Sequence, residues 1–339
     1  MKVAVLAMGG TIASAGTGGV TPRLSPDDLV AAVPQLRDVA AIETASFRQV
    51  PSGDLTLTDV AELAVEIGRR LAGGADGIVV TQGTDTIEET AFALDLLLPG
   101  PQPVVVTGAM RNPTLPGADG PANLLAAVQV AACPQASRMG VLVVANDEVH
   151  AARFVRKTAT ASPATFRSGT VGPVGWLVEG RPHIAFRVPS LGIGELPVPG
   201  PIPPVALLTS VIGDDARLVP ELERLGYAGL VIAGFGGGHV PGAVAPVLAE
   251  SATHIPVVLA SRAGSGELLR TTYGFPGAER DLLASGLISA EFLDAPKARV
   301  LLSLILAGGA EPGEVRAVFE KVGASGSGPT SPRRGSSIG

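Results

Sequence analysis

Cysteine and histidine are scarce in this chain of 339 residues. Cys133 is the single cysteine, and four histidines are scattered along the sequence. One cysteine excludes an intramolecular disulfide and any cysteine-based metal cluster, and scattered histidines do not supply the close spacing of a metal site. We therefore expect the protein to work without a metal ion or another cofactor.

Aromatic residues and positive charge are also in short supply. Aromatic side chains make up 4% of the sequence, so valine, leucine, isoleucine and alanine must fill the core. Hydrophobic residues reach 46% against 17% charged residues, which indicates a globular protein, and the length suffices for two domains. The formal net charge of −6 leaves no basic footprint for a phosphate backbone, so we expect no nucleic-acid partner.

Long apolar runs are absent as well. No run approaches the roughly 18 uninterrupted apolar residues of a membrane helix. Met1 leads directly into a strand-like run, without the basic stretch, apolar helix and small-residue cleavage site of a signal peptide. We expect a soluble, cytoplasmic protein that makes no membrane contact.

Strand-like apolar runs alternate with helix-like segments through the first half of the chain. In the segment 58–71, Leu63, Ile67 and Leu71 recur at four-residue spacing and share one helix face. This rhythm predicts an α/β fold with a mostly parallel sheet covered by helices on both faces. We expect strands at 2–7, 42–50, 76–81, 104–107 and 141–145, and helices at 26–33, 58–71, 87–98 and 120–132.

A proline- and glycine-rich stretch at 189–204 divides the sequence. Such a stretch can form neither a helix nor a central strand, so we interpret it as a linker. It separates a larger N-terminal catalytic domain, 1–188, from a smaller C-terminal α/β domain, 205–323. The tail 324–339 lacks apolar residues, and we expect it to be disordered. In the C-terminal domain we expect strands at 205–211, 229–234 and 256–260, and helices at 296–307 and 312–322.

Two threonines follow the ends of predicted strands. Thr11 comes after the strand at 2–7 through two glycines, and Thr84 comes after the strand at 76–81 through one. Each turn alone is more simply an ordinary turn with a capping hydroxyl. Because ligands of open α/β sheets bind outside the carboxyl ends of strands, the two hydroxyls are candidates for one cleft.

The residues after Thr84 fit the start of a helix. Thr86 and Glu89 have the spacing of a capping box, which would place Thr84 and Asp85 at the positive end of that helix.

A threonine hydroxyl needs a nearby base before it can act as a nucleophile. Asp85 is adjacent to Thr84, and Lys157 stands further along the chain. A lysine can serve as a base where burial lowers its pKa, whereas a carboxylate beside it works the other way. The residues alone leave this balance open, and Lys157 by itself is more simply a solvated surface charge.

Together, these segments resemble the bacterial-type asparaginase/glutaminase family of threonine amidohydrolases. The likeness runs over roughly residues 2–320, and the Gly-Thr-Asp-Thr segment followed about thirty residues later by Ala-Asp-Gly-Pro is its most specific part. The matching segments are 9–13, 83–90, 107–111, 117–124 and 140–144, the last leading to 157–158.

The resemblance implies an L-asparaginase that hydrolyses the side-chain amide of L-asparagine to L-aspartate and ammonia. It implies that Thr11 is the nucleophile that forms an acyl-enzyme. Thr84, Asp85 and Lys157 would form a companion triad, in which Lys157 accepts a proton from Thr84 and Asp85 orients the lysine or binds the substrate amino group. Which threonine attacks first stays open.

The resemblance also implies the substrate contacts and the assembly. Ser52 would hold the α-carboxylate with Gly53 contributing only backbone, and N–H groups near Gly10 and Ala109 would form an oxyanion hole. Tyr273 lies near the segment that, in the family, reaches a neighbouring subunit's site. We therefore expect a homo-oligomer, a dimer of dimers. We also expect it to bind a small-molecule amide as its substrate.

One departure from the family pattern keeps other functions open. Many relatives carry a tyrosine in the loop after the first threonine, but residues 12–30 contain none, and His239 in a glycine-rich loop could contact the substrate instead. The alternatives are a glutaminase-asparaginase of broader specificity, a non-catalytic amino-acid-binding or regulatory relative, and a tRNA-dependent amidotransferase subunit. A nucleotide-binding protein is disfavoured because the first glycine turn lacks a P-loop lysine.

Overall fold

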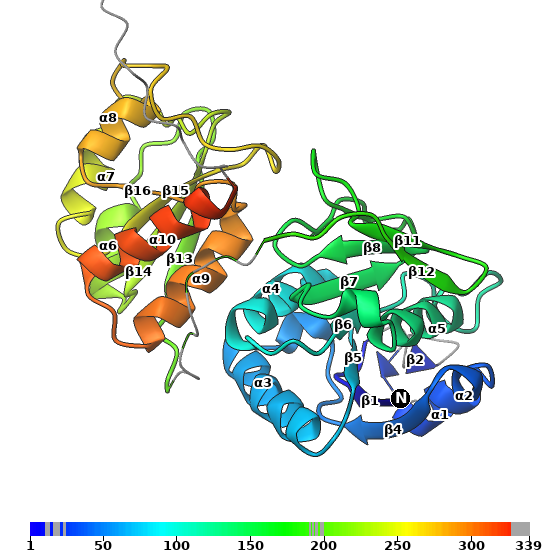
Figure 1. Cartoon of the computed structure of the whole chain (residues 1–339). Coiled ribbons are helices and arrows are strands. Elements are labelled where there is room, and N and C mark those ends of the chain that lie inside the picture. Colours follow the sequence, from blue (N-terminus) through cyan, green and yellow to red (C-terminus); the bar gives the residue numbers. More distant parts are fainter. Residues whose placement is uncertain are drawn as a thin grey trace, which may run out of the picture.

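The chain folds into two α/β units that lie side by side (Figure 1). The predicted α/β class is confirmed. No helix in the part of the chain that is described is long and apolar enough to cross a membrane. A computed structural model describes residues 1–10, 14–15, 21–22, 25–189, 191, 193, 196 and 200–326.

The N-terminal unit is built on an eight-stranded mixed sheet. Its strands are β1 (Lys2–Ala7), β4 (Ala41–Ser46), β5 (Gly77–Thr81), β6 (Val104–Thr107), β7 (Val141–Ala145), β8 (Glu148–Ala151), β11 (Gly175–Val178) and β12 (Arg181–Ile184). The spatial order is β12-β11-β8-β7-β6-β5-β1-β4. Neighbours from β4 to β7 pair in parallel, as predicted, and β8, β11 and β12 extend the sheet in antiparallel fashion.

Helices cover both faces of this sheet. Along β1, Ala4 and Leu6 enter one apolar core, and Val3 and Val5 enter the other, as the alternation of a strand requires. On α3 the predicted face is buried, with Leu63 fully and Leu71 partly enclosed. The helices are α1 (Pro26–Ala31), α2 (Leu36–Val39), α3 (Leu57–Ala72), α4 (Ile87–Leu97) and α5 (Gly120–Ala131).

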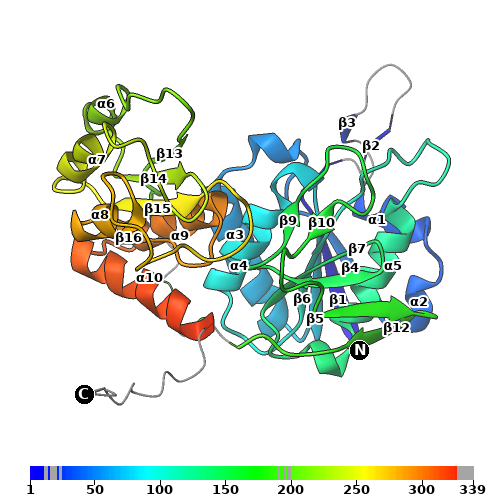
Figure 2. The same ribbon diagram turned by 90° about the horizontal axis from the view of Figure 1, so that it is seen from above.

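The C-terminal unit has a four-stranded parallel sheet. Its strands, in spatial order, are β13 (Val205–Thr209), β14 (Gly229–Gly234), β15 (Val257–Ser261) and β16 (Ile288–Ser289). Its helices are α6 (Val219–Arg224), α7 (Ala245–Ser251), α8 (Glu279–Ala284), α9 (Ala295–Ala307) and α10 (Pro312–Gly326). Helix α9 packs on β13 and β14 and also on α4 of the other unit, as Figure 2 shows. One apolar core therefore continues from the first unit into the second.

Several elements differ from the sequence expectation. The strand expected at 42–50 ends at Ser46, and α10 continues to Gly326, past the expected start of the tail; residues 327–339 lie outside the described part. The expected loop after β1 contains a small antiparallel pair, and other unpredicted strands are too short to show a period. The two-residue strands are β2 (Ser14–Ala15), β3 (Thr21–Pro22), β9 (Arg156–Lys157) and β10 (Phe166–Arg167), and β8, β11, β12 and β16 were not predicted either.

Candidate active site

The turns that follow β1 and β5 touch each other backbone to backbone. Gly10 has a φ of +89°, and a Cβ built on it would lie 2.0 Å from the backbone nitrogen of Gly83. Only glycine tolerates both the conformation and the approach. Thr84 follows Gly83 directly. Thr11, which follows Gly10 in the sequence, lies outside the described residues. The expected meeting of the two strand ends is therefore observed as far as Gly10.

Lys157 reaches both Thr84 and Asp85. Its Nζ donates a hydrogen bond to Thr84 Oγ1 at 2.9 Å and another to Asp85 Oδ1 at 2.6 Å. The threonine is buried, the lysine side chain is 15% exposed, and the aspartate side chain is 75% exposed. Thr84 and Asp85 begin a short 3₁₀ turn ahead of α4, and Lys157 ends β9. The geometry brings together the three residues of the expected triad, with an amine within proton-transfer distance of a hydroxyl.

Thr86 does not form the predicted capping box. Its backbone has φ −123° and ψ 14°, outside the extended region of an N-cap, and its side chain makes no capping hydrogen bond. The Thr86 hydroxyl instead donates to the Ser52 carbonyl at 3.1 Å and accepts from Gln82 Nε2 at 3.2 Å. The capping-box prediction is wrong because the hydroxyl finds a partner that is distant in sequence. This contact ties the Thr84 turn to the 3₁₀ turn Ser52–Asp54.

Ser52 and Gly53 occupy different surroundings within that 3₁₀ turn. The Ser52 side chain is buried, and a Cβ built on Gly83 would lie 2.6 Å from its Oγ, so the hydroxyl stands beside the Thr84 turn. Gly53 is open, since a Cβ built there would meet nothing within 4 Å. Ser52 is thus within the cluster, and Gly53 borders it.

The segment after β6 closes another side of the cluster. A Cβ on Gly108 would lie 3.2 Å from Thr84 Cγ2, and the next residue, Ala109, is buried. The Asp119 carboxylate accepts the backbone N–H groups of Met110 at 3.0 Å and of the following residue at 2.8 Å. Asn123 Nδ2 donates to the Gly108 carbonyl at 2.9 Å. The Ala-Asp-Gly-Pro motif therefore shapes the loop that carries Ala109.

A second polar cluster lies in the C-terminal unit. His239 Nε2 is 3.1 Å from Glu279 Oε2, and its ring centroid is 5.1 Å from that of Tyr273. Glu279 is fully buried and accepts the backbone N–H groups of Thr272 at 2.8 Å and Tyr273 at 2.6 Å. Burial opposes ionisation of Glu279, but these N–H groups and the histidine hold its pKa below the ordinary value. Sequence reasoning singled out His239 and Tyr273 but missed Glu279, whose role depends on folding of the loop.

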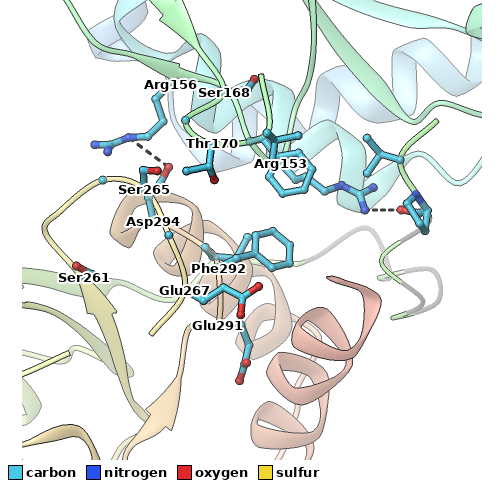
Figure 3. Close-up of a pocket in the computed structure, with 18 of the residues that line it drawn as sticks. Arg153, Arg156, Ser168, Thr170, Ser261, Ser265, Glu267, Glu291, Phe292 and Asp294 are labelled. Carbon is cyan, nitrogen blue, oxygen red and sulfur yellow. Dashed lines mark hydrogen bonds and ion pairs between the residues drawn. The ribbon is translucent and has the colours of Figure 1, made fainter. Parts of the chain in front are cut away.

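A cavity of about 360 Å³ lies between the two units (Figure 3). Its wall includes neither Thr84 nor Lys157, so this hollow is separate from the threonine cluster. The dashed line in Figure 3 joins Arg156 Nε to Asp294 Oδ2, at 3.4 Å. Residues from both units line the cavity, among them Arg153, Phe154, Arg156, Ser265, Phe292 and Asp294.

Comparison with known proteins gives matches along nearly the whole chain. Residues 2–189 match the family described as asparaginase, N-terminal, and residues 204–319 match the glutaminase/asparaginase C-terminal domain. The chain is 40% identical to the "Probable L-asparaginase" of Deinococcus radiodurans, covering 94% of this chain and 97% of that one. It is 35% identical to "L-asparaginase 2" of Bacillus subtilis, covering 94% and 86%. The crystal structure of the "Probable Cytoplasmic L-asparaginase" of Campylobacter jejuni superposes with a TM-score of 0.86 at 34% identity, covering 94% and 99%.

Proposed function

This chain belongs to the asparaginase/glutaminase family, and from that premise we propose that it is an L-asparaginase. The reaction converts L-asparagine and water to L-aspartate and ammonia. The observation that carries the proposal is the contact of Lys157 with Thr84 and Asp85, beside the turn that leads to Thr11. A hydroxyl, a base and a carboxylate are thus assembled where the carboxyl ends of parallel strands open.

The amide bond is broken in two steps. First, the Thr11 oxygen bonds to the side-chain amide carbon while its proton passes to the amide nitrogen, and the tetrahedral intermediate expels ammonia to leave an ester on the threonine. Water then attacks the ester carbon, aspartate leaves, and Thr11 regains its proton. Backbone N–H groups near Gly10 and Ala109 stabilise the negative oxygen of the intermediate.

The companion residues serve proton transfer and substrate binding. Lys157 is the base within reach of the Thr84 hydroxyl, at 2.9 Å. Asp85 orients the lysine and has an exposed carboxylate that can also bind the α-amino group of the substrate. Ser52, whose hydroxyl stands beside Gly83, holds the α-carboxylate.

We also propose that the enzyme is a homo-oligomer, a dimer of dimers, in which Tyr273 contacts a neighbouring subunit's site. Tyr273 and Phe275 leave 44% and 49% of their surface exposed in the single chain, as aromatic side chains at an interface would. Sedimentation velocity measures the assembly directly, and a monomer with full activity would contradict this part of the proposal.

A cytoplasmic location is proposed as well. It rests on the 34% identity to the Campylobacter jejuni enzyme whose name includes that location. Detection of the protein in the cytosolic fraction of its native cells would support it, and detection in an extracytoplasmic fraction would contradict it.

Activity on glutamine is the second candidate function. Glutamine differs from asparagine by one methylene, which a pocket discriminates by only about 1–3 kcal/mol. The family includes glutaminases, so broader specificity accords with the same cluster. A non-catalytic amino-acid-binding role accords less well, because binding alone does not require a lysine between a hydroxyl and a carboxylate.

The test is release of ammonia from L-asparagine and L-glutamine. We expect activity in the wild type and its loss in Thr11→Ala, Thr84→Ala and Lys157→Ala. Lys321→Ala, which removes an exposed lysine of α10, serves as the matched control and should keep full activity. A wild type that releases no ammonia, or a Thr11→Ala variant that equals it, would show that the mechanism is wrong.

A further inference from the structure

Lys297 is a charged side chain with no exposed surface. Its Nζ donates to the Val155 carbonyl at 2.7 Å and to Asp294 Oδ2 at 2.8 Å. Isolated charges are not buried without such partners, because the loss of hydration is too costly. Lys297 stands in the first turn of α9, for which Asp294 is the N-cap. The contact with Val155 therefore joins the C-terminal unit to the N-terminal unit.

Val155 lies two residues before Lys157. Arg156, between them, contacts the N-cap residue of α9. Asp294 pairs with Arg156, as the dashed line in Figure 3 marks, and it also pairs with Lys297. The Lys157 backbone N–H in turn donates to the Glu88 carboxylate of α4. Three consecutive residues of the chain are thus fixed by charged side chains from α9 and α4.

These contacts fix the backbone position from which the Lys157 side chain extends. Its amino nitrogen must reach Thr84 Oγ1, at 2.9 Å, from a strand of only two residues whose ladder is short. The Thr158 N–H donates to the Thr165 carbonyl on one side of this strand, and on the other side Lys297 supplies the contact to the Val155 carbonyl. A displacement of about 1 Å in a reacting group can cost about 10²-fold in rate, so the support given by α9 bears on chemistry.

We infer that Lys297 is a positioning residue for Lys157, acting through the Val155 carbonyl. This inference rests on the proposed role of Lys157 as the base. Lys297 is not itself catalytic, because its ammonium is enclosed and bound to Val155 and Asp294. The C-terminal unit thereby contributes to the reaction from within the same chain.

The test is Lys297→Met, which keeps the length of the side chain but removes its donors. We expect kcat for asparagine to fall about 10- to 100-fold, with KM changed less than about threefold because the substrate contacts are intact. Lys297→Arg keeps charge and donors and should recover part of kcat. A purely structural role would lower thermal stability without this separation of kcat from KM.

Arg299→Met is the matched control. Arg299 lies two residues further along α9, and its Nε donates to the Val205 carbonyl of the C-terminal unit at 2.9 Å. Its loss removes a comparable contact from the same helix but leaves the strand of Lys157 untouched. We expect wild-type kcat in this variant even if its melting temperature drops.

Asp294→Asn keeps the test decisive if Lys297→Met does not fold. It removes the charge shared by Arg156 and Lys297 and retains an N-cap side chain. We expect kcat to fall about 5- to 10-fold. Wild-type kcat in Lys297→Met, or in Asp294→Asn where the first variant is unfolded, overturns the inference, while loss of activity in Lys157→Ala still supports the proposed function. Activity retained in Lys157→Ala would instead refute the role of that lysine.

Discussion

Thr84, Asp85 and Lys157 form one polar cluster, the Thr84 cluster. His239, Tyr273 and Glu279 form another, the His239 cluster. The two contain similar chemical groups in opposite environments. Asp85 leaves 75% of its side chain exposed and shares a lysine with a hydroxyl. Glu279 is fully enclosed, and two backbone N–H groups and a histidine occupy its oxygens. A carboxylate saturated by backbone donors shapes a loop, whereas one that is open to solvent is free to meet a ligand. The difference between structural and chemical acids thus lies in their hydrogen-bond partners.

We expect the largest effect on catalysis from substitution of Asp85. Asp85→Asn should lower kcat roughly 10²-fold or more, because the amide cannot orient the Lys157 amino group as a carboxylate does. The free energy of unfolding should change by less than about 1 kcal/mol, since exposed pairs contribute little. Steady-state kinetics and urea unfolding of the same preparation measure the two quantities. A stable variant with unchanged kcat would remove Asp85 from the proposed machinery.

The glycine turn beside Thr84 gives the next largest effect. Gly10→Ala should reduce activity by about 10²-fold, because a Cβ would collide with the backbone of Gly83 and push the two turns apart. Gly68→Ala, on α3 and away from these turns, is the control, since its Cβ would enter open space. Ammonia release measures both variants. Equal activity in the two would show that close contact of the turns is unnecessary.

Glu279 should show the reverse profile of Asp85. Glu279→Gln should lower the free energy of unfolding by about 1–3 kcal/mol, because hydrogen bonds to a charged acceptor are replaced by weaker ones. The pKa of Glu279 is lowered in the folded protein, so its stabilisation is present above the ordinary value of about 4.3 and is lost as pH falls through the folded value.

The difference between wild type and Glu279→Gln should therefore shrink on acidification below that ordinary value. Thermal unfolding at a series of pH values measures it, with Glu250→Gln, an exposed position on α7, as the control. A difference that grows towards acid pH would contradict the sign of the pKa shift.

The smallest effect is expected at Tyr273. Tyr273→Phe should raise KM less than about tenfold and leave stability unchanged, because the hydroxyl is the only group removed and the ring contact with His239 is retained. Steady-state kinetics measure KM at protein concentrations at which the oligomer is formed and at which it dissociates. A loss of kcat as large as that of Asp85→Asn would move Tyr273 into the catalytic machinery.

The sequence predicted the elements with strong local signals. Strands β1, β5, β6 and β7 are continuous apolar runs, and helix α3 has a clear apolar face. These four strands and this helix were therefore predicted correctly. The Thr84 contact with Lys157 spans 73 residues and depends on a two-residue strand, so only the family resemblance indicated it.

Other parts of the site were hidden because their partners are distant. In the sequence, Lys297 resembles an ordinary exposed helix lysine. It can be buried because its Nζ donates a hydrogen bond to the Val155 carbonyl, 142 residues away in the sequence. Thr86 fits a capping box by spacing, but its hydroxyl is taken by Ser52. Charged and hydroxyl side chains have several possible partners, and tertiary structure selects among them.

The apolar core that passes from α4 into α9 has a consequence for how the protein comes apart. Neither unit can open without exposing apolar surface of the other, so the two should melt as one cooperative unit. A protease that cuts within 189–204 would leave two fragments bound to each other through this core. The segment between the units fixes their connectivity, and the shared core holds them together.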